Sequence, residues 1–394
     1  MKYYLKTKEE CDAVVARNDA FLRADRVVEG FNVAIYDYRL ASIGDFVDDE
    51  AFELRGLTFV ENPETGEWER NLLLQKFFNY SQTEGWMPED LDNKKITRVQ
   101  NKEDGSIISF VKFPNGSIRA KSKTSFESDQ AKMAQEFFDR KSIMKEEVDY
   151  LLSKGKTPVF ELVSPENQIV LEYQKTELVL LQIRNEDGTY MSEKDLKWYS
   201  MVMCVNQAKV FDIDDLLEKG KEVGAHTVLD TLLYYKKTSQ ENIEGWVVTF
   251  EDGQMAKIKT DHYIQLHGII GPDAFRENLL IQTILDGNMD DVIAQLVPGE
   301  KKDKMIEMDR KIVHNFNHLI NVFKGLRGKY FNEFSENRKE FALKYSKEPL
   351  FGYVMKSLNT SFRDVNQVAE VQVRAYMNKY TNSLGKAKEY IEGL

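Results

Sequence analysis

The spacing of apolar residues changes once along this chain of 394 residues, at about residue 272. Upstream, short alternating segments are separated by turn sequences, and Asn115-Gly116 between Ser106–Phe113 and Ser117–Lys123 is a strong hairpin signal. Downstream, apolar residues recur at helical spacing in Ala274–Gly287, Asp290–Leu296, Lys304–Leu326, Tyr330–Tyr345, Leu350–Leu358 and Val365–Ile391. We therefore expect an α+β fold, in which antiparallel sheets with flanking helices precede an all-helical C-terminal domain.

The part before residue 272 divides further by pattern. Residues 1–95 mix helix and strand, and residues 96–271 are rich in strands, with a second hairpin through Trp246–Phe250 and Met255–Lys259. The same spacing rules predict helices over Lys8–Asp25 and Ser128–Asp149, and strands over Asn32–Tyr36, Arg55–Val60, Val159–Val163, Ile169–Tyr173 and Leu178–Ile183. The predicted domains are therefore 1–95, 96–271 and 272–394.

Charge is distributed unevenly between these parts. The net charge is −11, but residues 301–394 hold 18 Lys and Arg against 11 Asp and Glu, a net charge of +7. The rest of the chain is correspondingly acidic. A basic helical domain suits a polyanionic partner, although a solvated helical surface would give the same pattern.

Several classes of protein are unlike this sequence. Two distant cysteines, Cys11 and Cys204, provide neither a disulfide framework nor a Cys-x-x-Cys metal site. No apolar run has the length of a membrane span, and the first residues lack the apolar core of a signal peptide. We expect a protein of the reducing cytoplasm that has no membrane partner.

A set of lysines and glutamates follows in a fixed order. Lys102-Glu103-Asp104-Gly105-Ser106 places an amine beside a carboxylate and a glycine, and alone it would be read as a surface turn before a strand. Glu161 and Glu244 follow on later predicted strands. Lys257 and Lys259 are two residues apart on a strand, so their side chains share one face. A nucleophilic amine, spaced carboxylates and paired cations suit attack on the α-phosphorus of a nucleoside triphosphate.

With these residues, the chain resembles the ATP-dependent RNA ligases of bacteriophages, the type 1 tRNA-repair ligases of the lysine nucleotidyltransferase superfamily. The resemblance runs from about Ile35 to His267, with a fainter match at Asp286–Val292. The matching stretches, in order, are Glu53-Leu54-Arg55-Gly56, Lys76-Phe77-Phe78-Asn79, Lys102-Glu103-Asp104-Gly105-Ser106, Lys121-Ser122-Lys123, Phe160-Glu161-Leu162-Val163-Ser164-Pro165, Asn242-Ile243-Glu244-Gly245 and Lys257-Ile258-Lys259, leading to Tyr263.

The resemblance implies a nucleotidyltransferase (ATP-grasp-like ligase) domain and roles for its residues. Lys102 would be the nucleophile, with Glu161, Glu244, Lys257 and Lys259 as the other catalytic residues. The ATP-binding set implied by the family is Tyr36, Arg55, Lys76, Lys102, Lys123, Glu161, Glu244, Lys257 and Lys259. Lys121 shares the strand geometry of Lys123, but by resemblance Lys123 matters more.

A divalent metal, Mg²⁺ with Mn²⁺ as an alternative, is implied as cofactor. Its carboxylates would be Glu161, Glu244, Asp290 and Asp291, acting partly through water because Mg²⁺ keeps much of its water shell. Asp290 and Asp291 also suit the N-terminal turn of a helix, and the two readings are compatible.

The implied reaction joins a 5′-phosphate to a 3′-hydroxyl of RNA through a lysyl-AMP intermediate and an adenylated RNA end. The partner would be RNA, a broken tRNA anticodon loop being the usual substrate of the family, and the expected state is a monomer in the cytoplasm of a phage host. A DNA ligase or a capping guanylyltransferase would append a β-barrel after Lys259, which the downstream pattern does not predict. An RNA-binding protein that had lost its chemistry remains the alternative from another class.

Overall fold

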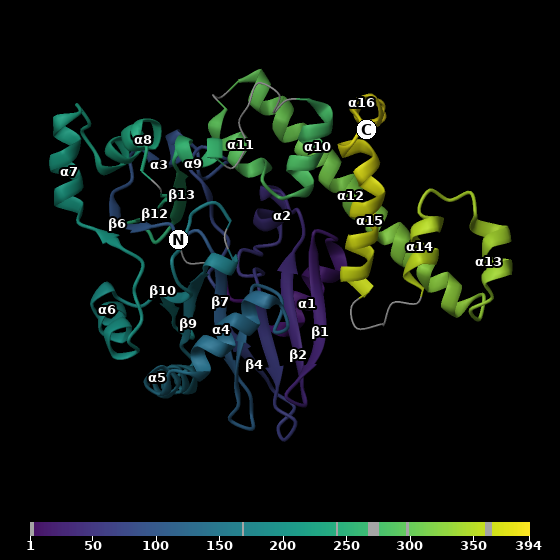
Figure 1. Ribbon diagram of the computed structural model, residues 1–394, viewed down its shortest axis with the longest axis horizontal. Helices are drawn as coiled ribbons and strands as arrows, with labels where there is room; N and C mark the ends of the chain where they lie inside the picture. The colour runs from purple at the N-terminus through teal and green to yellow at the C-terminus, as the bar shows by residue number, and fades with distance from the viewer. Residues whose placement is uncertain (1–3, 168, 242, 267–275, 297–298, 359–364) are drawn as a thin grey trace. The chain divides into compact units, whose positions relative to one another are not determined.

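The computed structural model describes residues 4–167, 169–241, 243–266, 276–296, 299–358 and 365–394. The chain forms two compact units: Met1–Tyr38 with Ile43–Ile269, and Arg39–Ser42 with Ile270–Leu394. The predicted boundary between residues 271 and 272 lies outside the described residues. The first unit is α+β and the second is helical, as the change in apolar spacing predicts (Figure 1). No helix in the described ranges combines the length and apolar character needed to cross a membrane.

Three sheets make up the first unit. One sheet has the order β1-β2-β3-β4, the second β10-β9-β7-β8 and the third β11-β6-β12-β13-β5. All named strand pairs are antiparallel except β13 with β5. The strands are β1 (Phe21–Val28), β2 (Phe31–Tyr38), β3 (Leu57–Glu61), β4 (Trp68–Asn71), β5 (Phe78–Asn79), β6 (Ile96–Asn101), β7 (Ser106–Lys112), β8 (Ile118–Lys121), β9 (Thr157–Val163), β10 (Glu177–Arg184), β11 (Val210–Phe211), β12 (Gly245–Phe250) and β13 (Met255–Lys259).

Helices flank these sheets. The helices of the first unit are α1 (Lys8–Arg17), α2 (Ile43–Asp48), α3 (Pro88–Leu91), α4 (Asp129–Asp139), α5 (Ser142–Ser153), α6 (Glu193–Val202), α7 (Ile213–Glu222), α8 (Val228–Thr238) and α9 (Asp261–Leu266), with a 3-10 turn at Pro165–Asn167. The sequence predicts no element for the stretch that contains α6, α7 and α8.

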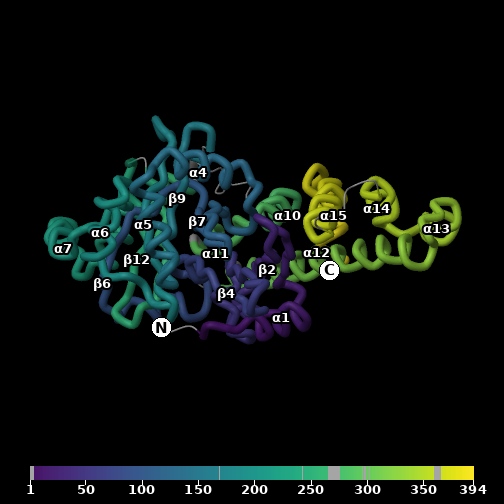
Figure 2. Tube along the Cα trace, turned by 90° about the horizontal axis from the view of Figure 1, so that it is seen from below, coloured from purple at the N-terminus to yellow at the C-terminus, as the bar shows by residue number. Residues whose placement is uncertain are grey.

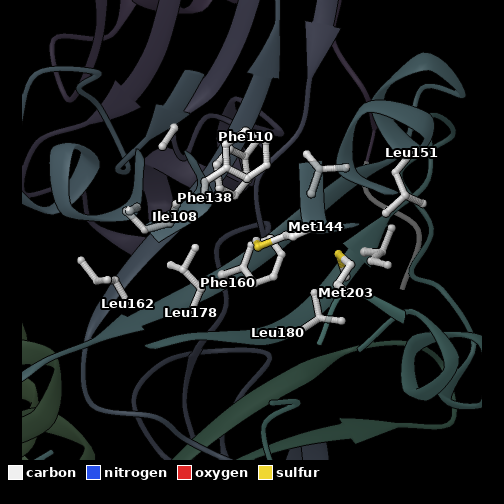
Figure 3. Close-up of a cluster of buried hydrophobic side chains, with 14 of the residues drawn as sticks. Ile108, Phe110, Phe138, Met144, Leu151, Phe160, Leu162, Leu178, Leu180 and Met203 are labelled. Atoms are coloured by element: carbon white, nitrogen blue, oxygen red, sulfur yellow. The ribbon is translucent and has the colours of Figure 1, made fainter. Parts of the chain in front are cut away.

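One hydrophobic core lies between the second sheet and helices α4, α5 and α6, whose places in the first unit Figure 2 shows. Phe110 and Phe160 from β7 and β9 are fully buried against Phe138 of α4 and Met144 of α5 (Figure 3). The single helix predicted over Ser128–Asp149 is therefore two helices, broken after Asp139. The break lets the apolar faces of both α4 and α5 pack against the same sheet. One straight helix of this length would extend past the edge of the sheet at one end.

The predicted helix over Lys8–Asp25 is also shorter than expected. Thr7 and Glu10 form a reciprocal capping box that starts α1, and the helix ends at Arg17. Phe21 onward is strand β1, which pairs with β2 along its whole length. Tertiary pairing therefore overrides the local helical spacing at this end of the segment.

The second unit is a bundle of helices, with α15 and α14 packed against the long helix α12 (Figure 2). Its helices are α10 (Glu277–Leu285), α11 (Met289–Gln295), α12 (Glu300–Asn332), α13 (Arg338–Tyr345), α14 (Phe351–Ser357), α15 (Val365–Thr381) and α16 (Leu384–Glu392). Helix α12 passes through the predicted gap between Leu326 and Tyr330, and it ends before Ser335 and Glu336, which adopt positive φ. The predicted helix over Val365–Ile391 divides at Ser383, whose side chain caps α16.

Candidate active site

Lys102 lies in a short loop that connects two of the sheets. Strand β6 of the third sheet ends at Asn101, and β7 of the second sheet begins at Ser106. The backbone N–H of Lys102 donates to the carbonyl of Gly245 at 2.9 Å, which extends the pairing of β6 with β12 by one residue. The loop 102–105 is therefore held at the junction of two sheets and is not a free surface turn.

The register of the third sheet brings Glu244 and Lys259 beside Lys102. Gly245 pairs with Lys259, and Trp246 pairs with Asn101. Glu244 is buried, with its Oε2 atom 2.7 Å from Lys102 Nζ and its Oε1 atom 3.3 Å from Lys259 Nζ. One carboxylate is thus shared by two lysines that are far apart in the sequence.

Gly245 makes this close approach possible. Its φ is +146°, and a Cβ atom there would lie 2.0 Å from the carbonyl oxygen of Ile258. Only glycine fits a position where the backbone of β13 comes so near.

Glu161 approaches from the second sheet. It lies in β9, opposite Ile107 of β7, and its side chain lines the same cavity as Lys102. Burial, aided by the charge of Glu244, raises the pKa of Glu161 to about 8, although the nearby Lys102 charge opposes the shift. A carboxyl group that holds its proton near neutral pH in this position would ionise readily if a divalent cation were bound beside it.

Asp104 fixes the Lys102 loop from inside. Its Oδ2 atom accepts hydrogen bonds from the backbone N–H groups of Val170 and Leu171 at 2.9 and 2.7 Å. Its Oδ1 atom accepts from the Tyr263 hydroxyl at 2.8 Å. The strand predicted over Ile169–Tyr173 is therefore wrong, because its amides bind a carboxylate and do not join a sheet.

Some of the predicted residues meet in a cavity of about 790 Å³. Five of them line it: Arg55, Lys102, Glu161, Lys257 and Lys259. Lys257 and Lys259 share a face of β13, as their spacing predicts. Apolar side chains such as Ile107 and Val247 line the same space, together with Arg98 and Gln100, which the motifs did not single out. A mixed wall of cations and apolar groups suits a nucleotide, which has an anionic tail and a flat base.

A second basic cluster lies around Tyr38. Lys76 Nζ is 3.4 Å from the Tyr38 hydroxyl, and Lys123 Nζ is 4.6 Å from the centre of its ring. Lys123 also forms an ion pair with Asp37 at 2.9 Å. Burial opposes ionisation of Tyr38, but Lys76, Lys123 and Arg55 outweigh it and lower the pKa of the phenol to about 7.

Tyr36, the tyrosine predicted to lie near the nucleotide, does not belong to this cluster. It is fully buried and donates its hydroxyl to Asp12 at 2.5 Å. Tyr38, two residues later on the same strand, contacts the predicted lysines in its place. The two-residue period of a strand gave both tyrosines the same face, so spacing alone could not choose between them. A role of Tyr36 in nucleotide binding stays a prediction.

Asp290 and Asp291 lie in the first turn of α11, in the second unit. Such a position suits carboxylates because of the helix dipole. Asp291 is buried, and the charge of Asp290 adds to burial in raising the pKa of Asp309 to about 7. Within the described residues, no three His, Cys, Asp or Glu side chains group as a metal cage. Metal binding by Asp290 and Asp291 therefore stays a prediction, and Asn242 of the matched stretch lies outside the described residues.

Comparison with known proteins agrees with the resemblance to RNA ligases. A family model described as RNA ligase matches residues 53–263. A protein of Thermovibrio ammonificans named "Putative RNA ligase" is 27% identical over 292 residues, which cover 70% of this chain and 70% of that protein.

Solved RNA ligases are similar at a lower level. The structure titled "Archaeal ATP-dependent RNA ligase - form 2" has a TM-score of 0.44 at 10% identity and covers 94% of this chain and 96% of its own. The Naegleria gruberi RNA ligase with PPi has a TM-score of 0.38 at 12% identity, over 63% of this chain and 77% of its own.

Proposed function

Since the chain belongs to the RNA ligase family, we propose that it is an ATP-dependent ligase that joins RNA 5′-phosphate and 3′-hydroxyl ends through a lysyl-AMP intermediate on Lys102. The observation that carries this proposal is the shared carboxylate of Glu244, 2.7 Å from Lys102 Nζ and 3.3 Å from Lys259 Nζ, beside a cavity large enough for a nucleotide. The amine of Lys102 and the cation of Lys259 then both contact the carboxylate of Glu244, which would accept a proton.

In the first step, Lys102 Nζ attacks the α-phosphorus of ATP. The Nζ–P bond forms as the bond from the α-phosphorus to the oxygen bridging it to the β-phosphorus breaks, and pyrophosphate leaves. The amine must lose a proton to attack, and Glu244 Oε2 is the atom placed to accept it. Lys257, Lys259 and Arg55 line the cavity where negative charge develops.

In the later steps, the AMP group passes from Lys102 to an RNA 5′-phosphate. The 3′-hydroxyl of the other end then attacks that phosphate, which seals the strand and releases AMP. Lys76 and Lys123 would bind the outgoing phosphates of ATP, as ammonium groups grouped around Tyr38.

The carboxylates present fit a divalent cation. Mg²⁺ prefers oxygen ligands and is commonly bound through one or two carboxylates, phosphates and waters. Glu161 and Glu244 supply such carboxylates, and the raised pKa of Glu161 marks a position that favours an added positive charge. When bound, the ion would offset phosphate charge.

The RNA partner we propose is a broken tRNA anticodon loop, with the basic helical unit as its docking part and a monomer as the working state. The net charge of +7 over residues 301–394 supports binding of a polyanion.

The deciding experiment is intact mass of protein shown to be AMP-free, incubated with Mg²⁺ and ATP, GTP or NAD⁺, beside the Lys102→Ala variant. A gain of one AMP from ATP that is absent in the variant supports the proposal. A GMP adduct would favour a capping enzyme. No adduct would favour an RNA-binding protein without ligase chemistry.

A further inference from the structure

Lys121 is a lysine of the matched motifs whose side chain cannot reach a ligand. It is the last residue of β8, and it is fully buried. Its Nζ atom lies 3.1 Å from the carbonyl oxygen of Gly56, 3.1 Å from that of Ser122 and 3.0 Å from that of Lys123. Three carbonyl acceptors use all three N–H bonds of an ammonium group, so the geometry is that of a charged lysine.

These contacts join two loops that carry cations of the predicted ATP-binding set. Gly56 directly follows Arg55, which lines the cavity, and Lys123 belongs to the basic cluster around Tyr38. The loops also touch directly, because a Cβ atom on Gly56 would lie 2.4 Å from the carbonyl oxygen of Lys123. The ammonium group of Lys121 therefore contacts both loops where they meet, at the carbonyl oxygens of Gly56 and Lys123.

Burial of this ammonium group opposes folding. Burial lowers the pKa of Lys121 to about 7, with Lys123 and Arg55 adding to the effect and Asp37 opposing it. A long apolar side chain would fill the same space without that cost. The contribution of Lys121 is therefore that its hydrogen bonds orient three backbone carbonyl groups. The two-residue alternation of a strand would place the side chains of Lys121 and Lys123 on one face. It does not apply to this pair, because β8 ends at Lys121 and Lys123 lies beyond it.

We propose that Lys121 is a positioning residue: its buried ammonium group fixes the backbone of Gly56 and Lys123 so that Arg55 and Lys123 present their charges to the phosphate tail of the nucleotide. This inference rests on the proposed ligase function for its substrate, but the geometry concerns any pyrophosphate-containing ligand. Lys121 itself does not touch the ligand.

The test compares Lys121→Met with wild type and with Lys112→Met, a matched loss of a lysine that pairs with Asp149 on the surface. We expect Lys121→Met to weaken pyrophosphate binding, measured by calorimetry, and to raise the KM for ATP in adenylation, each by about tenfold. Sealing of RNA that is already adenylated needs no phosphate tail, so its rate should stay within about twofold. Lys112→Met should match wild type in all three.

Unchanged pyrophosphate affinity in Lys121→Met would overturn the proposal, and so would an equal loss of the sealing step, which would indicate a general structural role. If Lys121→Met does not fold, Lys121→Gln, which keeps two N–H donors, carries the same comparison. If wild-type protein forms no lysyl-AMP, the proposed function fails, whereas the calorimetric comparison still decides the role of Lys121.

Discussion

The carboxylate of Glu244 lies 2.7 Å from the Nζ atom of Lys102, and the backbone of the next residue, Gly245, accepts the N–H of the same lysine. Both ends of Lys102 are therefore held by one dipeptide at the start of β12. The position of Lys102 therefore depends on the pairing of β6 with β12, while Asp104 fixes the rest of its loop.

Glu244→Gln keeps the shape of this side chain and removes its charge. We expect lysyl-AMP formation to fall by at least about 100-fold, because the proton acceptor is lost and Lys102 and Lys259 are left facing each other. The measurement is the single-turnover rate of AMP transfer to the protein. Glu177→Gln, at a surface pair with Lys175, is the control and should leave that rate unchanged.

Asp104→Ala removes a buried acceptor of three hydrogen bonds. The free energy of unfolding should fall by about 3 kcal/mol, since two backbone amides lose their partner. Tyr263→Phe removes only one of the three bonds and should cost about 1 kcal/mol. Denaturant titration of both variants measures the difference, and equal losses would show that the backbone amides of the 170–171 loop contribute nothing.

Gly245→Ala and Gly116→Ala separate crowding from backbone strain. Both glycines have positive φ, but a Cβ atom on Gly116 has nothing within 4 Å, whereas on Gly245 it meets the backbone of Ile258. We expect a loss of about 1–2 kcal/mol for Gly116→Ala from the left-handed conformation alone. Gly245→Ala should lower the free energy of unfolding by more than about 3 kcal/mol. The same variant should also lose adenylation activity. Thermal unfolding of the two variants tests this order.

Tyr38 should ionise near neutral pH. Its pKa is lowered from 10.0 to about 7, so the folded state releases this proton before the unfolded state does. Stability from this group is then gained as pH rises from about 7 to 10 and lost as pH falls through about 7. The phenolate absorbance of wild type minus Tyr38→Phe should appear with a midpoint near pH 7. A midpoint near 10 would contradict the cluster of Lys76, Lys123 and Arg55 around the ring.

Glu161 should give the opposite slope. Its pKa is raised from 4.5 to about 8, so the folded state keeps a proton that the unfolded state has lost. Stability from this group is full below about pH 4.5 and is lost as pH rises through about 8. In chelator, the melting temperature of Glu161→Gln minus that of wild type should therefore increase between pH 6 and pH 9. A flat difference would show that Glu161 ionises normally.

Part of the fold was predictable from local pattern. The structure confirms two predicted hairpins, one through Asn115-Gly116 and one through the turn before Met255. They were predictable because two-residue alternation and turn residues act over short distances in the chain. The helical character after residue 272 is confirmed for the same reason. Helix ends were less predictable: α1 stops at Arg17 because β1 finds a partner in β2, and α4 and α5 separate so that both reach one sheet.

The sequence by itself determined which groups are candidates for the chemistry, since Lys102, Glu161, Glu244, Lys257 and Lys259 could be named from residue type, order and resemblance. The tertiary structure alone decided how these groups are arranged. Register between β6, β12 and β13 joins Lys102, Glu244 and Lys259. In the second sheet, the end of β8 at Lys121 separates two lysines that spacing groups together, because Lys121 faces carbonyl oxygens while Lys123 faces Asp37. The physical reason is that side-chain direction beyond a strand end, burial and pKa all depend on neighbours distant in the chain, which local spacing does not record.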